Sequence, residues 1–147
     1  NIYCNNIVED AGQWYSLSIS NRWLYPVAGL DEMIAGEYLA EHEVSAFWER
    51  ATVHEGIAYG AFYSDSELFR TDVLTGEVLD ELPLEGFDAY IDSMDIMSDG
   101  TLVLVSQTSE LNKTLELFDV ADGSYQRGIT LPEGDRIGEH GLVCLTR

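Results

Sequence analysis

Residues 98–132 read SDGTLVLVSQTSELNKTLELFDVADGSYQRGITLP, and this stretch decides the fold class. Short runs of leucine, valine and other apolar residues occupy 101–105 and 115–119. A third run, residues 125–131, ends at Pro132. Short apolar runs bounded by turn residues are typical of β-strands. The stretch therefore predicts three consecutive strands.

The connections between these strands have the composition of turns. Asp99-Gly100 precedes the first strand and Asp122-Gly123 the third. Asp-Gly between apolar runs indicates a tight hairpin, because glycine takes the positive φ that such a turn requires. The polar residues 106–114 predict a longer connection between the first two strands.

Glycines at a fixed spacing indicate an internal repeat. Gly12, Gly56 and Gly100 are 44 residues apart, and Gly141 follows 41 residues later. An apolar run comes directly after each of them. A period of this length is typical of repeat architectures with four short strands per unit.

A second signature recurs downstream of each anchor glycine. An acidic residue at the end of a strand can accept hydrogen bonds from the backbone amides of the next turn. A glycine four residues later then takes the positive φ of a short hairpin. The pairs are Asp72 with Gly76, Asp119 with Gly123 and, less clearly, Glu32 with Gly36. The first unit could be helical around Glu32, but its register with the other two favours strand.

A further candidate strand precedes each anchor glycine, which gives four antiparallel strands per unit. The sequence thus predicts a single all-β domain, residues 1–147, made of blade-like units over 1–44, 45–86 and 87–134 and a partial unit over 135–147. A four-stranded unit of about 40–45 residues is typical of a β-propeller blade.

The third unit resembles a blade of the YVTN/PQQ/WD40-like β-propeller superfamily. The resemblance is carried by Asp99-Gly100, by Asp119 with Gly123 and by Pro132 with Gly134, and unit two has matching residues. It covers about two-thirds of the chain, and the Trp-Asp dipeptide of a strict WD40 repeat is not among the motifs. These motifs specify architecture and leave the chemistry open.

Three units and part of a fourth are at or below the number needed for a closed ring. We expect a fragment of a longer propeller, a ring completed by further copies, or a small irregular disc. Unpaired strand edges are a liability, so an isolated open arc is the least favoured state. The alternative fold is an irregular β-sandwich or barrel built from the same hairpins.

The net charge of −20, from 27 acidic and 7 basic residues, limits the partners. Nucleic acid and anionic membranes favour basic surfaces, so neither is expected as a partner. No apolar run approaches the roughly 18–20 residues of a membrane helix, so no membrane insertion is expected. The charge suits solubility or a cationic partner. A protein partner or copies of the same chain remain as candidates.

Other features indicate an extracellular or cell-surface location. The chain begins with Asn1, which indicates processing or trimming. Cys4 and Cys144 lie near opposite ends, where either two buried thiols or a disulfide is compatible with the sequence; a disulfide requires an oxidising compartment. Asn112-Lys113-Thr114 matches a glycosylation sequon.

Candidate site residues are few. His54-Glu55 and Glu139-His140 each precede an anchor glycine, at turns expected on one rim of a propeller. Two histidines and two carboxylates suit a divalent cation such as zinc, although exposed turn residues would look the same. No other cofactor is indicated.

Two further groups of residues have a structural alternative. Trp23 and Tyr25 lie in an expected connection and could form a binding surface, or simply pack. The acidic series Asp88, Asp92, Asp95 and Asp99 lacks the spacing of a calcium loop, so we favour a solvated channel wall.

The sequence contains no nucleophile elbow and no glycine-rich phosphate loop, and no catalytic residues are predicted. It favours a non-enzymatic, extracellular scaffold or binding module of the β-propeller type, within a larger assembly or longer chain. The alternative is a segment of a propeller enzyme. The superfamily resemblance extends to lactonases and quinoprotein dehydrogenases, which implies a metal or cofactor at the channel rim.

Overall fold

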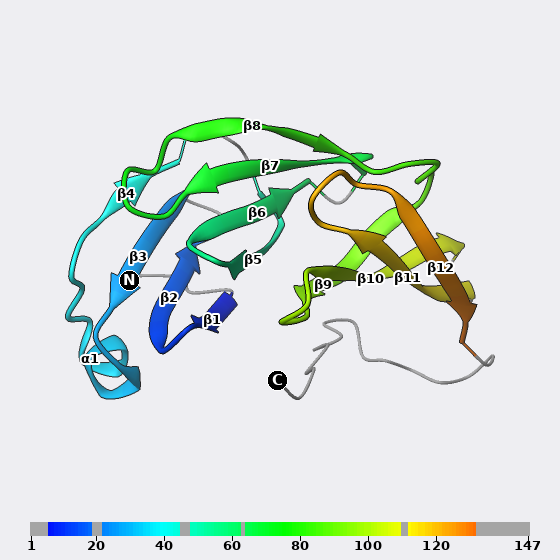
Figure 1. The fold of residues 1–147 in the computed structure, drawn as a ribbon. Helices are drawn as coiled ribbons and strands as arrows, with labels where there is room; N and C mark the ends of the chain where they lie inside the picture. The colour runs from blue at the N-terminus through cyan, green and yellow to red at the C-terminus, as the bar shows by residue number, and fades with distance from the viewer. Residues whose placement is uncertain (1–5, 19–21, 45–47, 63, 110–111, 132–147) are drawn as a thin grey trace.

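The computed structural model describes residues 6–18, 22–44, 48–62, 64–109 and 112–131, and most of them lie in three antiparallel sheets (Figure 1). Sheet 1 contains β1 (Asn6–Asp10), β2 (Gln13–Ser18), β3 (Trp23–Val27) and β4 (His42–Glu43). Sheet 2 contains β5 (Arg50–His54), β6 (Ile57–Ala61), β7 (Glu67–Asp72) and β8 (Val78–Pro83). Sheet 3 contains β9 (Tyr90–Ile96), β10 (Thr101–Ser109), β11 (Asn112–Asp119) and β12 (Tyr125–Thr130). The predicted repeat of four antiparallel strands is confirmed.

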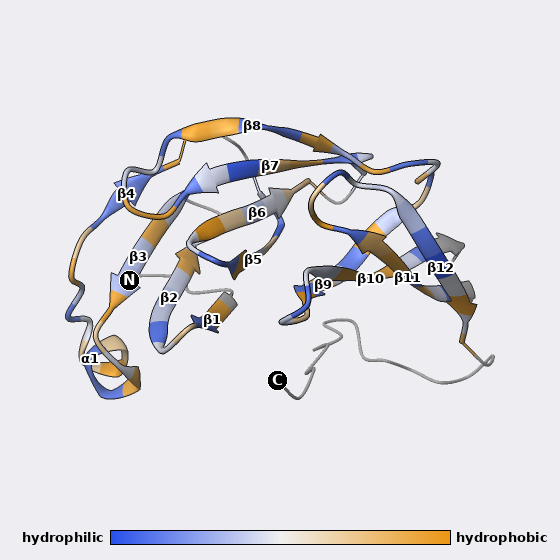
Figure 2. Cartoon of the chain, viewed as in Figure 1, coloured by the Kyte–Doolittle hydropathy of each residue, from blue (hydrophilic) through white to orange (hydrophobic). Residues whose placement is uncertain are grey.

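Sheet 2 lies between the other two, and its inner strands pack against both of them. Successive side chains of a strand point to opposite sides of its sheet, and both hydrophobic and hydrophilic residues occur along the strands (Figure 2). On β6, Ala58 belongs to the apolar cluster shared with sheet 1, whereas Tyr59 belongs to the cluster shared with sheet 3. Phe118, Leu102 and Leu104 of sheet 3 complete the second cluster. Face-to-face burial of apolar side chains therefore holds the three sheets together.

The first strand of each sheet lies beside the first strand of the next. Thr52 Oγ1 of β5 donates a hydrogen bond of 3.1 Å to Asp95 Oδ1 of β9, and Arg50 Nε donates to the backbone oxygen of Asp92. Because residue number rises along both strands between these contacts, β5 and β9 run in the same direction. All turns that follow these inner strands therefore lie at one rim, and their starting ends lie at the other.

The Asp-x-x-x-Gly turns form as the sequence predicts. Asp72 Oδ1 accepts hydrogen bonds from the amides of Leu74 (2.7 Å) and Thr75 (3.0 Å), and Gly76 has φ +75°. In sheet 3, Asp119 Oδ1 accepts from Ala121 N at 2.9 Å, and Gly123 also has φ +75°.

Each of these glycine turns lies against the outer strand of the preceding sheet. A Cβ atom on Gly76 would be 2.9 Å from Cβ of His42 in β4. A Cβ atom on Gly123 would overlap the carbonyl oxygen of Pro83, the last residue of β8. Glycine at these positions thus allows the backbones of adjacent sheets to approach closely.

The first unit departs from the repeat, and the strand predicted around Glu32 is wrong. Residues 30–35 form helix α1 (Leu30–Ala35), with Gly36 at φ +75° as its C-cap. Gly36 does take a positive φ, but it ends a helix rather than a hairpin. No helix in the described ranges is long and apolar enough to cross a membrane.

Two predicted connections are strand instead. Residues 23–26 belong to β3, and the polar stretch 106–114 contains the end of β10 and the start of β11. Polar residues are compatible with these strands because neighbouring strands satisfy their backbone groups; Ser106, for example, pairs with Thr114.

Glu116 on β11 provides a test of the packing between sheets 2 and 3. It pairs with Leu104, on the same face as Phe118, and burial raises the pKa of its carboxyl, opposed by the Ser106 hydroxyl. An acid with a raised pKa in the folded state binds more protons when folded, so stability falls as pH rises from its ordinary pKa of 4.5 through the raised value.

We therefore expect Glu116→Gln to be more stable than the wild type at pH 7, with the difference shrinking below pH ~4, where Glu116 is protonated in both states. Urea denaturation across this pH range measures the effect. Glu77→Gln, a change at an exposed turn residue, is the control and should follow the wild type. A Glu116→Gln variant less stable than the wild type at pH 7 would contradict burial as the cause.

Candidate functional site

His54 and Glu55, two of the four predicted metal ligands, lie where β5 turns into β6. Glu55 (φ +50°) and Gly56 (φ +76°) form the two-residue turn, and Gly56 N donates a 2.9 Å hydrogen bond to Asp10 Oδ2 of sheet 1. The other two, Glu139 and His140, lie outside the described residues. In the ranges that the structure describes, no three His, Cys, Asp or Glu side chains are grouped closely enough to hold a metal ion.

The turn rim is nevertheless a place where charged groups meet. Asp99, in the β9–β10 turn, has a lowered pKa, mainly because Thr101 donates backbone and side-chain hydrogen bonds to it and in part because of the His54 charge. Asp10, His54 and Asp99 thus come from the equivalent turns of three sheets. Asp10 and Asp99 accept hydrogen bonds from the backbone amides of Gly56 and Thr101, which stabilises the turns.

Trp23 and Tyr25 lie on β3, on the face of sheet 1 that points away from sheet 2. The rings of Trp23 and Tyr25 are stacked with centroids 6.2 Å apart, and the Tyr38 ring lies 4.5 Å from that of Tyr25. Tyr25 is only 7% exposed. The structure therefore joins these aromatic residues in one packed row, and a binding role for them stays a prediction.

Cys4 and Cys144 lie outside the described residues, so their pairing stays a prediction. Asn112 is the first residue of β11, paired with Ser109 across the hairpin, and its glycosylation is likewise still a prediction.

Two members of the acidic series have protein partners rather than solvent alone. Asp92 forms an ion pair with Lys113 of β11, and Asp95 accepts the hydrogen bond from Thr52. Asp88 lies just before β9 and makes no side-chain hydrogen bond to another described residue. A solvated channel wall thus describes the series only in part.

The α1 insertion exposes large apolar side chains that the repeat itself does not need. Leu30 is 47% exposed, Ile34 78% and Leu39 63%. Leu30 and Ile34 are one helical turn apart, so they lie on the same side of α1. Residues 23–43 include five carboxylates and no lysine or arginine. The acids are Asp31, Glu32, Glu37, Glu41 and Glu43. We call Leu30, Ile34 and Leu39 with these acids the α1 surface.

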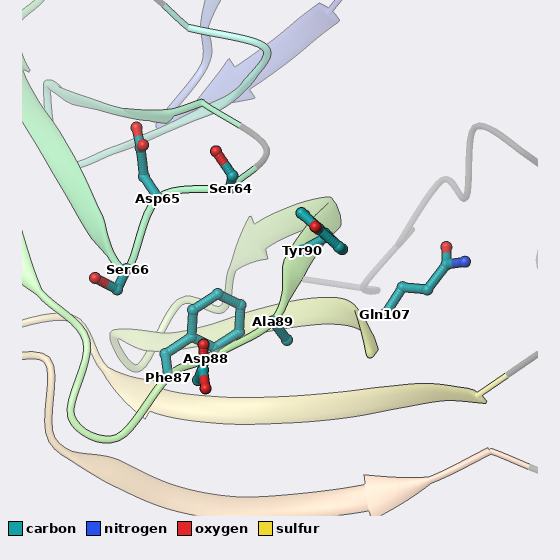
Figure 3. A pocket seen from close by; sticks show the side chains of 8 residues that line it. All are labelled: Ser64, Asp65, Ser66, Phe87, Asp88, Ala89, Tyr90 and Gln107. Atoms are coloured by element: carbon teal, nitrogen blue, oxygen red, sulfur yellow. The ribbon is translucent and has the colours of Figure 1, made fainter. Parts of the chain in front are cut away.

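A cavity of about 420 Å³ lies between sheets 2 and 3, at the rim opposite the predicted metal residues (Figure 3). One wall is Ser64 to Ser66, in the connection between β6 and β7. The other wall is Phe87 to Tyr90, leading into β9, and Gln107 of β10 completes the lining. Its volume is in the range of pockets that bind small molecules.

Hydrogen bonds and a ring contact hold the two walls of this cavity. Asp65 Oδ2 accepts a 3.0 Å hydrogen bond from Phe62 N, which fixes the 64–66 wall. Leu84 N donates to Ser66 O at 2.8 Å and ties that wall to the segment before Phe87. The ring of Phe87 packs edge-to-face on Phe118, with centroids 6.0 Å apart. The cavity is therefore part of the folded structure.

Sequence reasoning missed this cavity. Its walls come from segments more than 20 residues apart, and Tyr90 pairs with Gln107 across β9 and β10. A usable signal was present: Ser64-Asp65-Ser66 and Asp88 lie at strand ends that the repeat brings to the same rim.

Comparison with known proteins gives a likeness of fold. No protein-family model matches the sequence, and no curated protein matches it. Myxococcus xanthus glutaminyl cyclase matches over 85% of this chain and 51% of its own, with a TM-score of 0.65 and 13% identity. Kuenenia stuttgartiensis hydrazine synthase matches over 82% of this chain and 34% of its own, with a TM-score of 0.55 and 15% identity.

The chain thus spans about half of the first of these proteins and a third of the second. Both have β-propeller-type folds. Together with the three four-stranded sheets, the likeness shows that this chain has a β-propeller-like fold.

Proposed function

We propose that this chain is a scaffold and binding module of the YVTN/PQQ/WD40-like propeller type, acting outside the cell within a larger assembly or longer chain. The observation that carries the proposal is the α1 surface. Where the repeat has a five-residue turn in sheet 2 (residues 73–77), sheet 1 has the longer connection 28–41 with α1 inside it. Residues inserted into a repeat and not needed for its packing are candidates for binding.

The chemistry of the α1 surface indicates the partner. Exposed leucine and isoleucine side chains with a polar rim are typical of protein–protein contacts. The rim here is acidic, as is the chain as a whole at −20. A partner with an apolar contact patch and a basic rim would be complementary, and opposite charge would speed its association.

A defined surrogate partner tests this proposal. We expect an 18-residue amphipathic peptide of leucine and lysine to bind the chain, measured by calorimetry, and Ile34→Asp to weaken that binding roughly tenfold by placing a charge in the apolar contact. Leu74→Asp is a matched control, because Leu74 is 76% exposed but lies in the β7–β8 turn. It should bind as the wild type does.

Equal binding by the two variants would contradict the proposal, since it would show that overall charge alone attracts the peptide. Analytical ultracentrifugation of the chain without peptide tests whether a second copy of the chain binds the α1 surface. A mass above 16.4 kDa that falls on Ile34→Asp would make a second copy the partner.

A second candidate function is a segment of a lactonase-like or quinoprotein-like propeller enzyme. It is favoured by the names of the two similar structures, both enzymes, and by the charge of His54 acting on Asp99 across the turn rim. Elemental analysis that finds about one equivalent of a divalent metal per chain in the wild type, and none in His54→Ala, would support this alternative over a purely structural module.

A further inference from the structure

The cavity between sheets 2 and 3 is separate from the α1 surface and has its own chemistry. At about 420 Å³ it is too large for a bare metal ion and suits a small organic molecule or one long side chain. Its rim position, at the starting end of β9, leaves Tyr90 52% exposed. An aromatic ring beside polar groups is a frequent element of ligand sites.

All of the polar side chains in the lining can accept hydrogen bonds, and the two aspartates can only accept. Asp88 is exposed, and Asp65 uses only its Oδ2 atom, for its own loop. Within the described parts of the chain, the side chains of Ser64, Ser66 and Gln107 make no hydrogen bonds. Carboxylates accept only, while hydroxyl and amide groups can also accept. The cavity thus offers several acceptors to a ligand that donates.

The charge of the cavity has one sign. Asp65 and Asp88 are in the lining, and none of the eight lining residues is lysine or arginine. Two cations lie nearby outside the lining: Lys113, opposite Gln107, is paired with Asp92, and Arg50 donates hydrogen bonds to the backbone oxygens of Asp92 and Glu49. Both have partners of their own, so an anionic ligand would meet the two lining carboxylates, whereas a cation would gain those carboxylates and the exposed part of the Tyr90 ring.

We infer that this cavity binds an organic cation, through an ammonium or guanidinium group held by Asp88 and packed on Tyr90. The cation could be a free small molecule or the lysine or arginine side chain of a protein, because both present the same donors. The negative field of the chain would favour either one.

Titration with butylammonium and butylguanidinium, followed by amide NMR shifts, tests the inference. We expect saturable shifts at residues 64–66 and 87–90, and none with n-butanol or butyrate, which lack the positive charge. A basic octapeptide titrated in parallel distinguishes the two sources. Tighter binding of the small cations than of the peptide identifies a free ligand, and tighter binding of the peptide identifies a side chain.

Two variants test whether the cations bind in this cavity. Asp88→Asn removes one charge from an exposed residue without a structural hydrogen bond, and we expect roughly fivefold weaker binding. Tyr90→Leu should weaken binding of both cations as well, since the ring face is lost. Glu77→Gln removes the same charge in the β7–β8 turn and should change little.

The inference is overturned if neither probe saturates, or if Asp88→Asn and Glu77→Gln weaken binding equally. Thermal unfolding of each variant shows that the fold persists. Neither Asp88→Asn nor Tyr90→Leu lies in the α1 surface. A negative result for the cavity therefore does not bear on the peptide experiment with Ile34→Asp, and a negative result in the peptide experiment does not bear on the cavity.

Discussion

Replacing Gly123 with alanine is expected to lower the free energy of unfolding by about 3 kcal/mol, because strain at positive φ adds to overpacking. Gly123 has φ +75°, a conformation that costs an L-residue energy. The new Cβ would also overlap the carbonyl oxygen of Pro83 and lie 3.0 Å from its carbonyl carbon. Both neighbours are backbone atoms, so sheets 2 and 3 would have to separate.

That separation would break further contacts at the same place. Glu85 N donates to Gly123 O at 2.9 Å, and Tyr125 N donates to Glu85 Oε2 at 3.1 Å. Both hydrogen bonds join the β11–β12 turn to the segment after β8. Their loss is part of the expected destabilisation, because the backbone groups that lose a partner must find water instead.

Urea denaturation of Gly123→Ala against Gly86→Ala measures this effect. Gly86 has φ +68°, but its Cβ would meet nothing within 4 Å, so only the backbone strain of about 1–2 kcal/mol applies. A Gly123→Ala variant no less stable than Gly86→Ala would show that the close approach of the two sheets does not exist in solution.

Replacing Gly60 with alanine is expected to cost about 2–3 kcal/mol, for packing reasons alone. Gly60 lies on β6 without a positive φ, and the indole of Trp48 lies over it. An added Cβ would be 2.5 Å from Trp48 Cγ and Cδ1. Trp48 is 2% exposed in the cluster between sheets 1 and 2, so its ring has little room to move.

Gly128→Ala is the control for this substitution. Gly128 lies on β12, where a Cβ would be 2.6 Å from the Tyr125 hydroxyl, the far end of a flexible and half-exposed side chain, and at ordinary contact distance, 3.5 Å, from Cγ2 of Thr114. We expect a change within about 0.5 kcal/mol there, as for most surface substitutions. A Gly60→Ala cost that persists unchanged in a Trp48→Leu background would contradict the proposed clash, since contacting residues should be coupled.

The turns and the four-stranded units could be predicted because their causes are local. An aspartate oxygen that binds the next amides and a glycine at positive φ act within five residues, as at Asp72 to Gly76. Alternation of apolar residues then fixes which side of each strand is buried.

The same reasoning failed where two local signals coincide. Gly36 ends a helix and Gly76 closes a hairpin, yet both have φ +75°. The repeat register could not tell these apart, because a glycine in this conformation serves either structure. Nor could the register show the cavity, whose walls meet only through the packing of sheet 3 on sheet 2.

The contact of each glycine turn with the preceding outer strand gives the row of sheets a direction. Each such contact is heterologous, because a turn of one sheet packs against the outer strand of the preceding sheet. The sheets can therefore follow one another in one order only. A sheet added after sheet 3 could repeat the contact by placing its turn on β12, whose six residues are all exposed. A sheet added before sheet 1 would meet α1 instead of a glycine turn. A further sheet on the C-terminal side could therefore use the same turn-on-strand contact. A further sheet on the N-terminal side would need a different contact.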